Sequence, residues 1–581
     1  NNRASGSGSG QQQPAASRAA TEIILIPHQL YFLLPSMATM VKEMDVEEAK
    51  AQQQNKYDRQ LRLWGARGQA ALAGARVLLV GAGPTATETA KNLVLPGVGA
   101  VTVLDGHAVG PRDLANNFFV TPADVGKPRA EAAAAALAEL NPDCACDWRR
   151  AFPEEVLATE PGYVAAFTLV VGCQLRGALQ LQLAQACRAR GVPLLLVRSY
   201  GLIGHVRIVT DNHEVVEARP DPAPVDLRLA DPFPTLREYA LGGLDLAALD
   251  NAAHGHVPYV LLLLRLQKAW KDQHEGRLPA TFEEKQAFKA SVRAAARDFA
   301  MELNFQEAHA EAYRAYVAQE LPYEVAELFE LEEVLNPKPT SSNFIFLVRA
   351  LKDFMAAEGE GKPPLSGQIP DMTGSSEMYM AVQEIYQARA RADQAAVGAR
   401  LRALLAAAGR PEDTVSEEEL ATFCKNTLSL QRYASGALEE EFQPAPDQLK
   451  ETVAMAMMDL PEDAAQCPLL WYIGLRGVDQ FFEKNGHYPG TQEDLLLPDG
   501  MSLWNEMQTL VKGWETEVPP LSKKHATEMT RYGGAELHNI AAVIGGIASQ
   551  EAVKIITHQF TPLKNTLIYN GIAGISGVYE L

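Results

Sequence analysis

The chain has 581 residues, a formal net charge of −20 at pH 7 and a hydrophobic content of 47%. A chain this acidic repels a phosphate backbone, and no run of lysine or arginine offsets the charge locally, so nucleic acid is excluded as an expected partner. Its six cysteines are scattered and include no C-x-x-C pair, which argues against a zinc knuckle or a disulfide framework. This cysteine usage is typical of a reducing compartment, the cytoplasm or the nucleus.

Residues 1–54 form a low-complexity leader that contains "ASGSGSGQQQPAAS" and a short apolar stretch interrupted by Pro27 and His28. The apolar stretch is too short to span a bilayer, and no basic region precedes it as in a signal peptide. We therefore expect no membrane partner. We interpret the leader as a disordered extension or a gene-model extension and exclude it from the fold.

Residues 55–210 alternate short apolar strands with helices. Strands are expected over 76–80, 100–105, 167–172, 193–199 and 205–210, and helices over 87–95, 127–140 and 177–191. The strand sequences are leucine-rich or β-branched and do not alternate with polar residues, which is typical of strands buried on both faces. The pattern predicts an α/β domain with a doubly wound, Rossmann-like parallel sheet.

A glycine-rich turn follows the first of these strands. Gly81, Gly83 and Ala86 form the pattern G-x-G-x-x-A, and Asp105 ends the next strand, where a ribose-binding acid is expected. Pro84 argues against a nucleotide, because proline has no backbone N–H to donate to a phosphate. The motif alone leaves two interpretations open, a nucleotide site and a turn kept for packing.

Long amphipathic helical patterns fill residues 211–524. Helices are expected over 259–270, 291–303 and 343–355. Residues 525–581 return to a small-residue helix that can pack closely, over 536–560, and to an apolar strand over 565–571. The sequence thus predicts an α/β domain that is interrupted by a large, mostly helical insertion and closed by the last segment.

Short motifs lie along the chain from about Tyr57 to Leu581. One set comprises "KYDRQLRLWG", "NNFFV", "VGKPRAE" and "GGIASQEAVKIITHQF", and a second comprises "YGLIGHVRI", "DLRLADPFP", "HVPY", "IPDM" and "RYGGAELHNIAA". The first set resembles the ThiF/MoeB-like adenylation domain of ubiquitin-like-modifier activating enzymes. The second is similar, more narrowly, to the regulatory subunits of neddylation-activating enzymes.

Active members of the family adenylate a modifier with ATP and Mg²⁺ and then transfer it to a cysteine. The resemblance implies that the residues for this chemistry are replaced here. Asn116 stands where active members have an arginine, Arg129 replaces a lysine, and Gln174 replaces the metal-binding aspartate. No cysteine lies in the C-T-x-R context of the catalytic cysteine, so the insertion resembles a catalytic-cysteine domain without its cysteine.

The resemblance therefore implies that this chain binds neither a cofactor nor a metal, and that ATP and Mg²⁺ belong to a catalytic partner. It leaves a degenerate loop formed by Gly81, Gly83, Pro84, Ala86, Asp105, Asn116 and Gln174. It also implies that Asp105 survives as a packing or turn group at the end of its strand.

Arg59, in "KYDRQLRLWG", is the residue to which the resemblance assigns a catalytic role, in trans, in the ATP site of the partner. A guanidinium suits this role because it is always charged and binds phosphate oxygens in a planar fork. The residues alone predict only an amphipathic helix with solvated arginines. The resemblance further implies an interface with the partner, at His256, Asp371, Met372, Tyr379 and Glu384.

The predicted function is that of a non-catalytic regulatory subunit. Its expected partners are the catalytic subunit, with which it forms a heterodimer, and the ubiquitin-like modifier of neddylation. Three alternatives stay open: a self-sufficient adenylating or dinucleotide-dependent enzyme, the equivalent half of another activating enzyme, and an independent scaffold. The length of the insertion argues against the corresponding half of the sumoylation enzyme.

Overall fold

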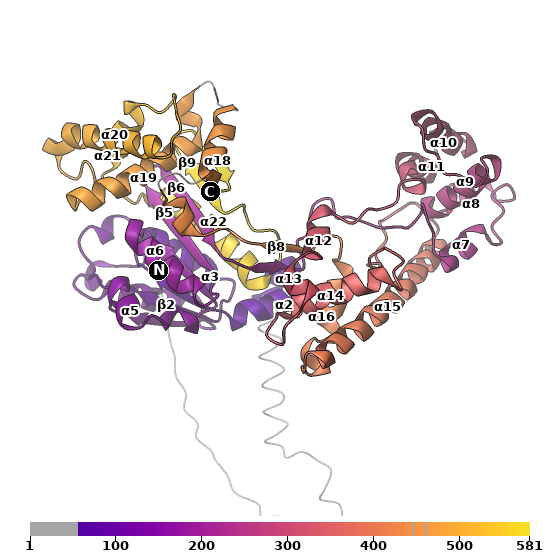
Figure 1. The fold of residues 1–581 in the computed structure, drawn as a ribbon, viewed down its shortest axis with the longest axis horizontal. Helices are drawn as coiled ribbons and strands as arrows, with labels where there is room; N and C mark the ends of the chain where they lie inside the picture. Colours follow the sequence, from indigo (N-terminus) through magenta and orange to yellow (C-terminus); the bar gives the residue numbers. More distant parts are fainter. Residues whose placement is uncertain (1–55, 444–446, 459–460, 462) are drawn as a thin grey trace, which may run out of the picture. The chain divides into compact units, whose positions relative to one another are not determined.

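The computed structural model describes residues 56–443, 447–458, 461 and 463–581 (Figure 1). The predicted leader, residues 1–54, lies outside the described residues. An eight-stranded sheet has the order β10-β9-β6-β5-β4-β1-β2-β3. Its strands are β1 (Arg76–Val80), β2 (Ala100–Leu104), β3 (Ala145–Arg149), β4 (Leu169–Cys173), β5 (Leu194–Tyr200), β6 (Ile203–Val209), β9 (Thr566–Asn570) and β10 (Ile575–Tyr579).

Strands β1 to β5 run parallel, as predicted, but the rest of the sheet does not. Strands β6, β9 and β10 pair antiparallel, so the sheet is mixed. Only Gly201 and Leu202 join β5 to β6, and this connection is too short for the crossover that parallel strands require. Strand β3 was not predicted, because its sequence "ACDWR" is mostly exposed and contains no apolar run.

Helices cover both faces of the sheet, as a doubly wound fold requires. Those with buried residues in the core of one face are α2 (Asp58–Gly74), α3 (Pro84–Val94), α4 (Arg129–Leu140) and α22 (His538–Thr557). The other face carries α5 (Pro153–Thr159) and α6 (Gly177–Arg188). Helix α22 lies directly against α3, where a Cβ on Gly545 would be 2.8 Å from the backbone nitrogen of Thr89. The small residues of α22 thus permit the close packing that the sequence predicted.

Helix α22 is also the one helix in the described part of the chain that is long and apolar enough to cross a membrane. Most of it is buried, in contact with α3, β5 and β6. These contacts identify it as a core helix of the sheet domain.

The other α-helices of the described residues lie between residues 234 and 532. They are α7 (Pro234–Leu241), α8 (Asn251–His254), α9 (Tyr259–Gln273), α10 (Phe282–Ala295), α11 (Leu303–Ala310), α12 (Tyr323–Leu328), α13 (Glu332–Leu335), α14 (Asn343–Ala356), α15 (Ser376–Ala407), α16 (Glu417–Lys425), α17 (Leu438–Glu441), α18 (Asp447–Met458), α19 (Pro468–Asn485), α20 (Leu496–Gly513) and α21 (Lys523–Tyr532). A short ladder pairs β7 (His213–Val215) with β8 (Gln431–Tyr433).

The predicted insertion contains two groups of helices. Residues between 225 and 430 form two apolar clusters of their own, whereas helices α18 to α21 share a core with Tyr200, Ile203 and Ile568 of the sheet. The prediction of a helix over 291–303 is wrong beyond Ala295, because α10 ends at that residue. The chain turns there because the Glu302 carboxylate accepts the backbone N–H of Arg297 at 2.7 Å.

A buried ion network joins α17 and α19 to strand β6. The Arg207 Nε donates to the Glu441 carboxylate at 3.0 Å, and Tyr472 donates its hydroxyl to the same carboxylate. The Arg476 Nη1 in turn donates to the Tyr472 oxygen at 2.9 Å. Burial alone would raise the pKa of Glu441, but the charges of Arg207 and Arg476 outweigh it and the pKa lies below its usual value. The carboxylate is therefore ionised in the folded state.

We expect Glu441→Gln to lower the free energy of unfolding by about 3–5 kcal/mol at pH 7, because it leaves two buried guanidinium groups without their carboxylate. Since the folded pKa is lowered, the stabilisation is present above the ordinary glutamate pKa of about 4.3 and is lost as the pH falls through the folded value. Urea denaturation at several pH values measures both effects. The exposed neighbour Glu440→Gln is the control, and equal stability of the two variants would contradict the prediction.

Candidate functional site

The candidate site is a cavity of about 610 Å³ at the carboxyl ends of β1, β2 and β4. Doubly wound sheets bind their ligands at this edge. The cavity brings together Gly81, Asp105, Gln174 and Arg129 from the predicted loop and its surroundings. Its wall is completed by residues that the sequence did not single out, among them Phe152, Arg176, Phe482 and Tyr488.

Both oxygens of the Asp105 carboxylate bind groups of this chain. Oδ2 accepts the backbone N–H of Ala82 at 2.8 Å and the Nε and Nη2 of Arg129 at 3.0 and 2.7 Å. Oδ1 accepts the backbone N–H of His107 at 2.8 Å. Burial raises the pKa of Asp105, yet hydrogen bonds from His107 and the charge of Arg129 lower it below the usual value. Asp105 thus organises the glycine turn.

The glycine turn continues into α3, whose first turn binds a carboxylate of this chain. Gly83 is the N-cap residue and Pro84 the first residue of the helix. The Glu536 carboxylate accepts the backbone N–H of Thr85 at 3.2 Å and its hydroxyl at 2.7 Å. A Cβ on Gly83 would lie 2.8 Å from Glu536 Oε1, so a larger residue here would displace the carboxylate from its present position. Burial raises the pKa of Glu536, against the lowering effect of these hydrogen bonds.

Asn116 and Gln174, two further residues of the predicted degenerate loop, also bind within the chain. Asn116 donates its Nδ2 to the backbone carbonyl of Glu536 at 2.8 Å. The Gln174 amide exchanges two hydrogen bonds with the backbone of Ser199, at 2.7 and 2.9 Å. The hydroxyl oxygens of Ser199 and Thr85 lie 2.7 Å apart. Asn116 and Gln174 are therefore members of one polar network around Glu536 and Thr85.

Sequence reasoning missed Glu536, although the residue lies in the motif "RYGGAELHNIAA". Thr85 and Glu536 are separated by 451 residues. The motif could have marked the segment as important, but no local pattern reports which distant turn it contacts.

Three of the buried thiols are not activated as nucleophiles. Burial raises the pKa of Cys173, Cys187 and Cys424, for the last two to about 12. Such thiols remain protonated and unreactive near neutral pH. In the part of the chain that the structure describes, no group of three or more histidine, cysteine or acidic side chains could hold a metal ion.

Arg59 lies near the start of α2 and is exposed. Trp64 and Leu72 of the same helix are buried in the core of the sheet domain. Arg59 itself forms no hydrogen bond or ion pair with any residue that the structure describes. Its guanidinium is thus available for another molecule.

The structure brings two of the predicted interface segments together. The backbone N–H of Ser375, which caps α15, donates to the carbonyl of His256 at 2.7 Å. His256, Asp371 and Glu384 are exposed, and Glu384 forms an ion pair with Arg391.

The apolar members of the predicted interface differ in exposure. Tyr379 is half-buried, and Met372 is only 8% exposed and packs in an apolar core. The exposed methionine of the segment is Met380, at 66%. Met372 therefore supports the segment from within, whereas Met380 is accessible.

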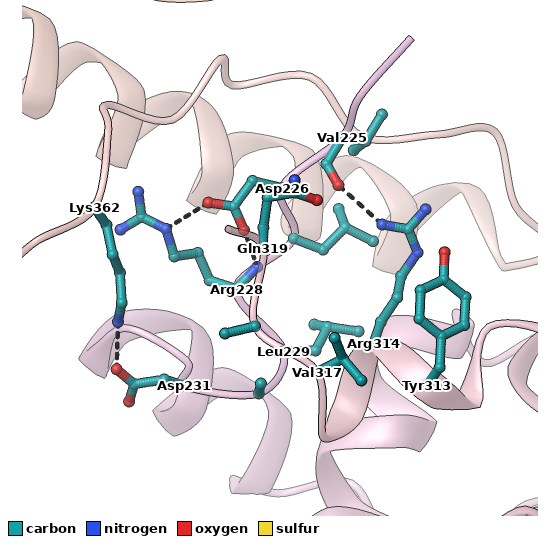
Figure 2. A pocket seen from close by; sticks show the side chains of 13 residues that line it. Val225, Asp226, Arg228, Leu229, Asp231, Tyr313, Arg314, Val317, Gln319 and Lys362 are labelled. Carbon is teal, nitrogen blue, oxygen red and sulfur yellow. Dashed lines mark hydrogen bonds and ion pairs between the residues drawn. The ribbon is translucent and has the colours of Figure 1, made fainter. Parts of the chain in front are cut away.

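A second pocket lies in the helical region and contains none of the predicted site residues (Figure 2). Its charged side chains bind one another or the backbone: Arg228 binds Asp226 at 2.8 Å and Lys362 binds Asp231. The Arg314 Nη1 donates to the carbonyl of Val225 at 2.8 Å. These contacts hold the extended segment 225–231 in place, which is a structural role.

Comparison with known proteins agrees with the predicted fold. The ThiF family model matches residues 57–576. The NEDD8-activating enzyme E1 regulatory subunit of Xenopus laevis is 36% identical over 536 residues, which cover 91% of this chain and 98% of that one. The subunit of the same name from Danio rerio is 35% identical over 539 residues, with coverages of 92% and 100%.

The NEDD8-activating enzyme E1 regulatory subunit AXR1 of Arabidopsis thaliana is 37% identical over 551 residues, with coverages of 93% and 98%. Matches of this length include both the sheet domain and the helical insertion. The chain therefore belongs to the ThiF family and, within it, to the NEDD8-activating enzyme E1 regulatory subunits.

Proposed function

We propose that this chain is the non-catalytic half of a heterodimeric activating enzyme for the ubiquitin-like modifier of neddylation. It supports adenylation and thioester formation by a separate catalytic subunit and supplies Arg59 to the ATP site of that subunit. ATP and Mg²⁺ are bound by the catalytic subunit. The six free thiols fit a reducing compartment, and we assign the complex to the cytoplasm and the nucleus.

One observation carries the proposal: the groups that would receive a nucleotide are already bound within this chain. Arg129 binds Asp105, and Glu536 binds the first turn of α3. A nucleotide here would have to displace both contacts and approach two carboxylates. The alternative of a self-sufficient adenylating enzyme lacks support for this reason.

The assignment of Arg59 rests on its availability. An exposed arginine without a partner among the described residues keeps all five N–H donors for another molecule. Arginines supplied in trans stabilise the charge that develops in phosphoryl transfer and raise rates by about 10³-fold to 10⁵-fold in other enzymes. Electrostatic stabilisation of the same kind is required when a carboxylate attacks ATP.

We expect Arg59→Ala to lower adenylate formation by the reconstituted heterodimer by about 10³-fold, because one transition-state cation is lost. ATP–pyrophosphate exchange measures this rate, and size-exclusion chromatography checks that the heterodimer still forms. Arg62→Ala, exposed on the same helix, is the matched control and should retain activity. An unchanged exchange rate for Arg59→Ala would show that the trans role is wrong.

The proposed interface with the catalytic subunit includes His256 and the segment from Asp371 to Glu384. We expect Met380→Asp to weaken heterodimer formation about tenfold or more, because a buried charge without a partner opposes association. Calorimetric titration with the catalytic subunit measures the dissociation constant. Leu497→Asp, at a position that is 84% exposed on α20, is the control. Equal affinities for the two variants would place the interface elsewhere.

A further inference from the structure

The first turn of α3 contains the donors of an anion site. A helix N-terminus presents backbone N–H groups without intrahelical partners and carries a partial positive charge, so it binds phosphates and carboxylates. Helix α3 has 11 residues and follows a glycine turn. Pro84 removes one donor, which leaves the backbone N–H and the hydroxyl of Thr85 pointing at the same acceptor, the Glu536 carboxylate.

Backbone contacts on both sides hold Glu536 in this position. The carbonyl of Ala535 accepts the N–H of Gly201 at 2.7 Å, in the turn between β5 and β6. The carbonyl of Glu536 accepts the side-chain amide of Asn116 at 2.8 Å. The carboxylate is thus held by its own main chain, and the approach over Gly83 leaves no room for even one added methyl group.

We propose that Glu536 is the built-in ligand of this anion site and takes the position at the helix N-terminus that an external oxyanion would need. The carboxylate matches an oxyanion in charge and in its hydrogen bonds to Thr85. While it is bound, it excludes phosphate groups both by volume and by charge. This inference deepens the proposed function, since it explains why this half of the enzyme holds no nucleotide, but it rests on contacts within this chain alone.

Removal of the built-in ligand should open the site to an external anion. We expect Glu536→Ala to lower the thermal midpoint of the purified full chain by several degrees, because the donors of α3 lose their acceptor. Inorganic phosphate at millimolar concentration should raise the midpoint of this variant by binding to the folded state. The wild-type chain should show no such dependence beyond that seen with chloride at equal ionic strength.

Two further variants separate this inference from simpler explanations. Glu536→Gln keeps the volume and an acceptor oxygen for Thr85, so phosphate should not stabilise it. Glu483→Ala removes an exposed carboxylate from the wall of the 610 Å³ cavity without vacating the helix terminus, and should behave as wild type. If Glu536→Ala does not fold without phosphate, refolding yields with and without phosphate give the same comparison.

Stabilisation by phosphate that is confined to Glu536→Ala would support the inference. An equal response in the wild type or in Glu483→Ala would overturn it, and so would a Glu536→Ala variant whose midpoint or refolding yield phosphate does not raise. The measurement uses this chain without the catalytic subunit, so it does not depend on the result for Arg59.

Discussion

The return of the last segment to the first half of the α/β domain is the constraint on which this domain depends, and the Glu536 carboxylate at the first turn of α3 is one of the contacts that fix it. The contact joins Thr85 to Glu536, which lie 451 positions apart. Thr85 precedes the helical insertion in the sequence, and Glu536 follows it. Two neighbouring contacts have the same effect: α22 packs on α3, and β9 pairs with β6. The first half of the domain therefore has a complete core only when the last segment returns.

The residues of the predicted degenerate loop form a consistent set of contacts within the chain. Asp105 binds Arg129, Gln174 binds the backbone of Ser199, and Asn116 binds the backbone of Glu536. A loop that had merely lost its ligand would leave buried polar groups unsatisfied, which costs free energy. Here these polar groups have partners in the chain, and their contacts stabilise the loop. Arg59, by contrast, has no such partner among the described residues, and this availability is the basis on which we propose its role in trans.

In the helical region, residues of the same type differ in how exposed their side chains are. Met372 and Met380 lie in one segment, yet the first packs in a core and the second is accessible. In the same region, Arg228 and Lys362 line a pocket but are bound to aspartates. Residue type alone therefore does not identify a binding surface, because the tertiary contacts decide which side chains remain available.

The parallel strands, the glycine turn and the small-residue helix could be predicted from the sequence, since each depends on local apolar patterns or on the identity of single residues. The antiparallel strands, the exposed edge strand β3, the break after Ala295 and the burial of Met372 depend instead on tertiary contacts. So does the binding of Glu536 to α3. These features depend on which distant segments meet, and a local pattern reports the burial of a residue but not the partner that buries it.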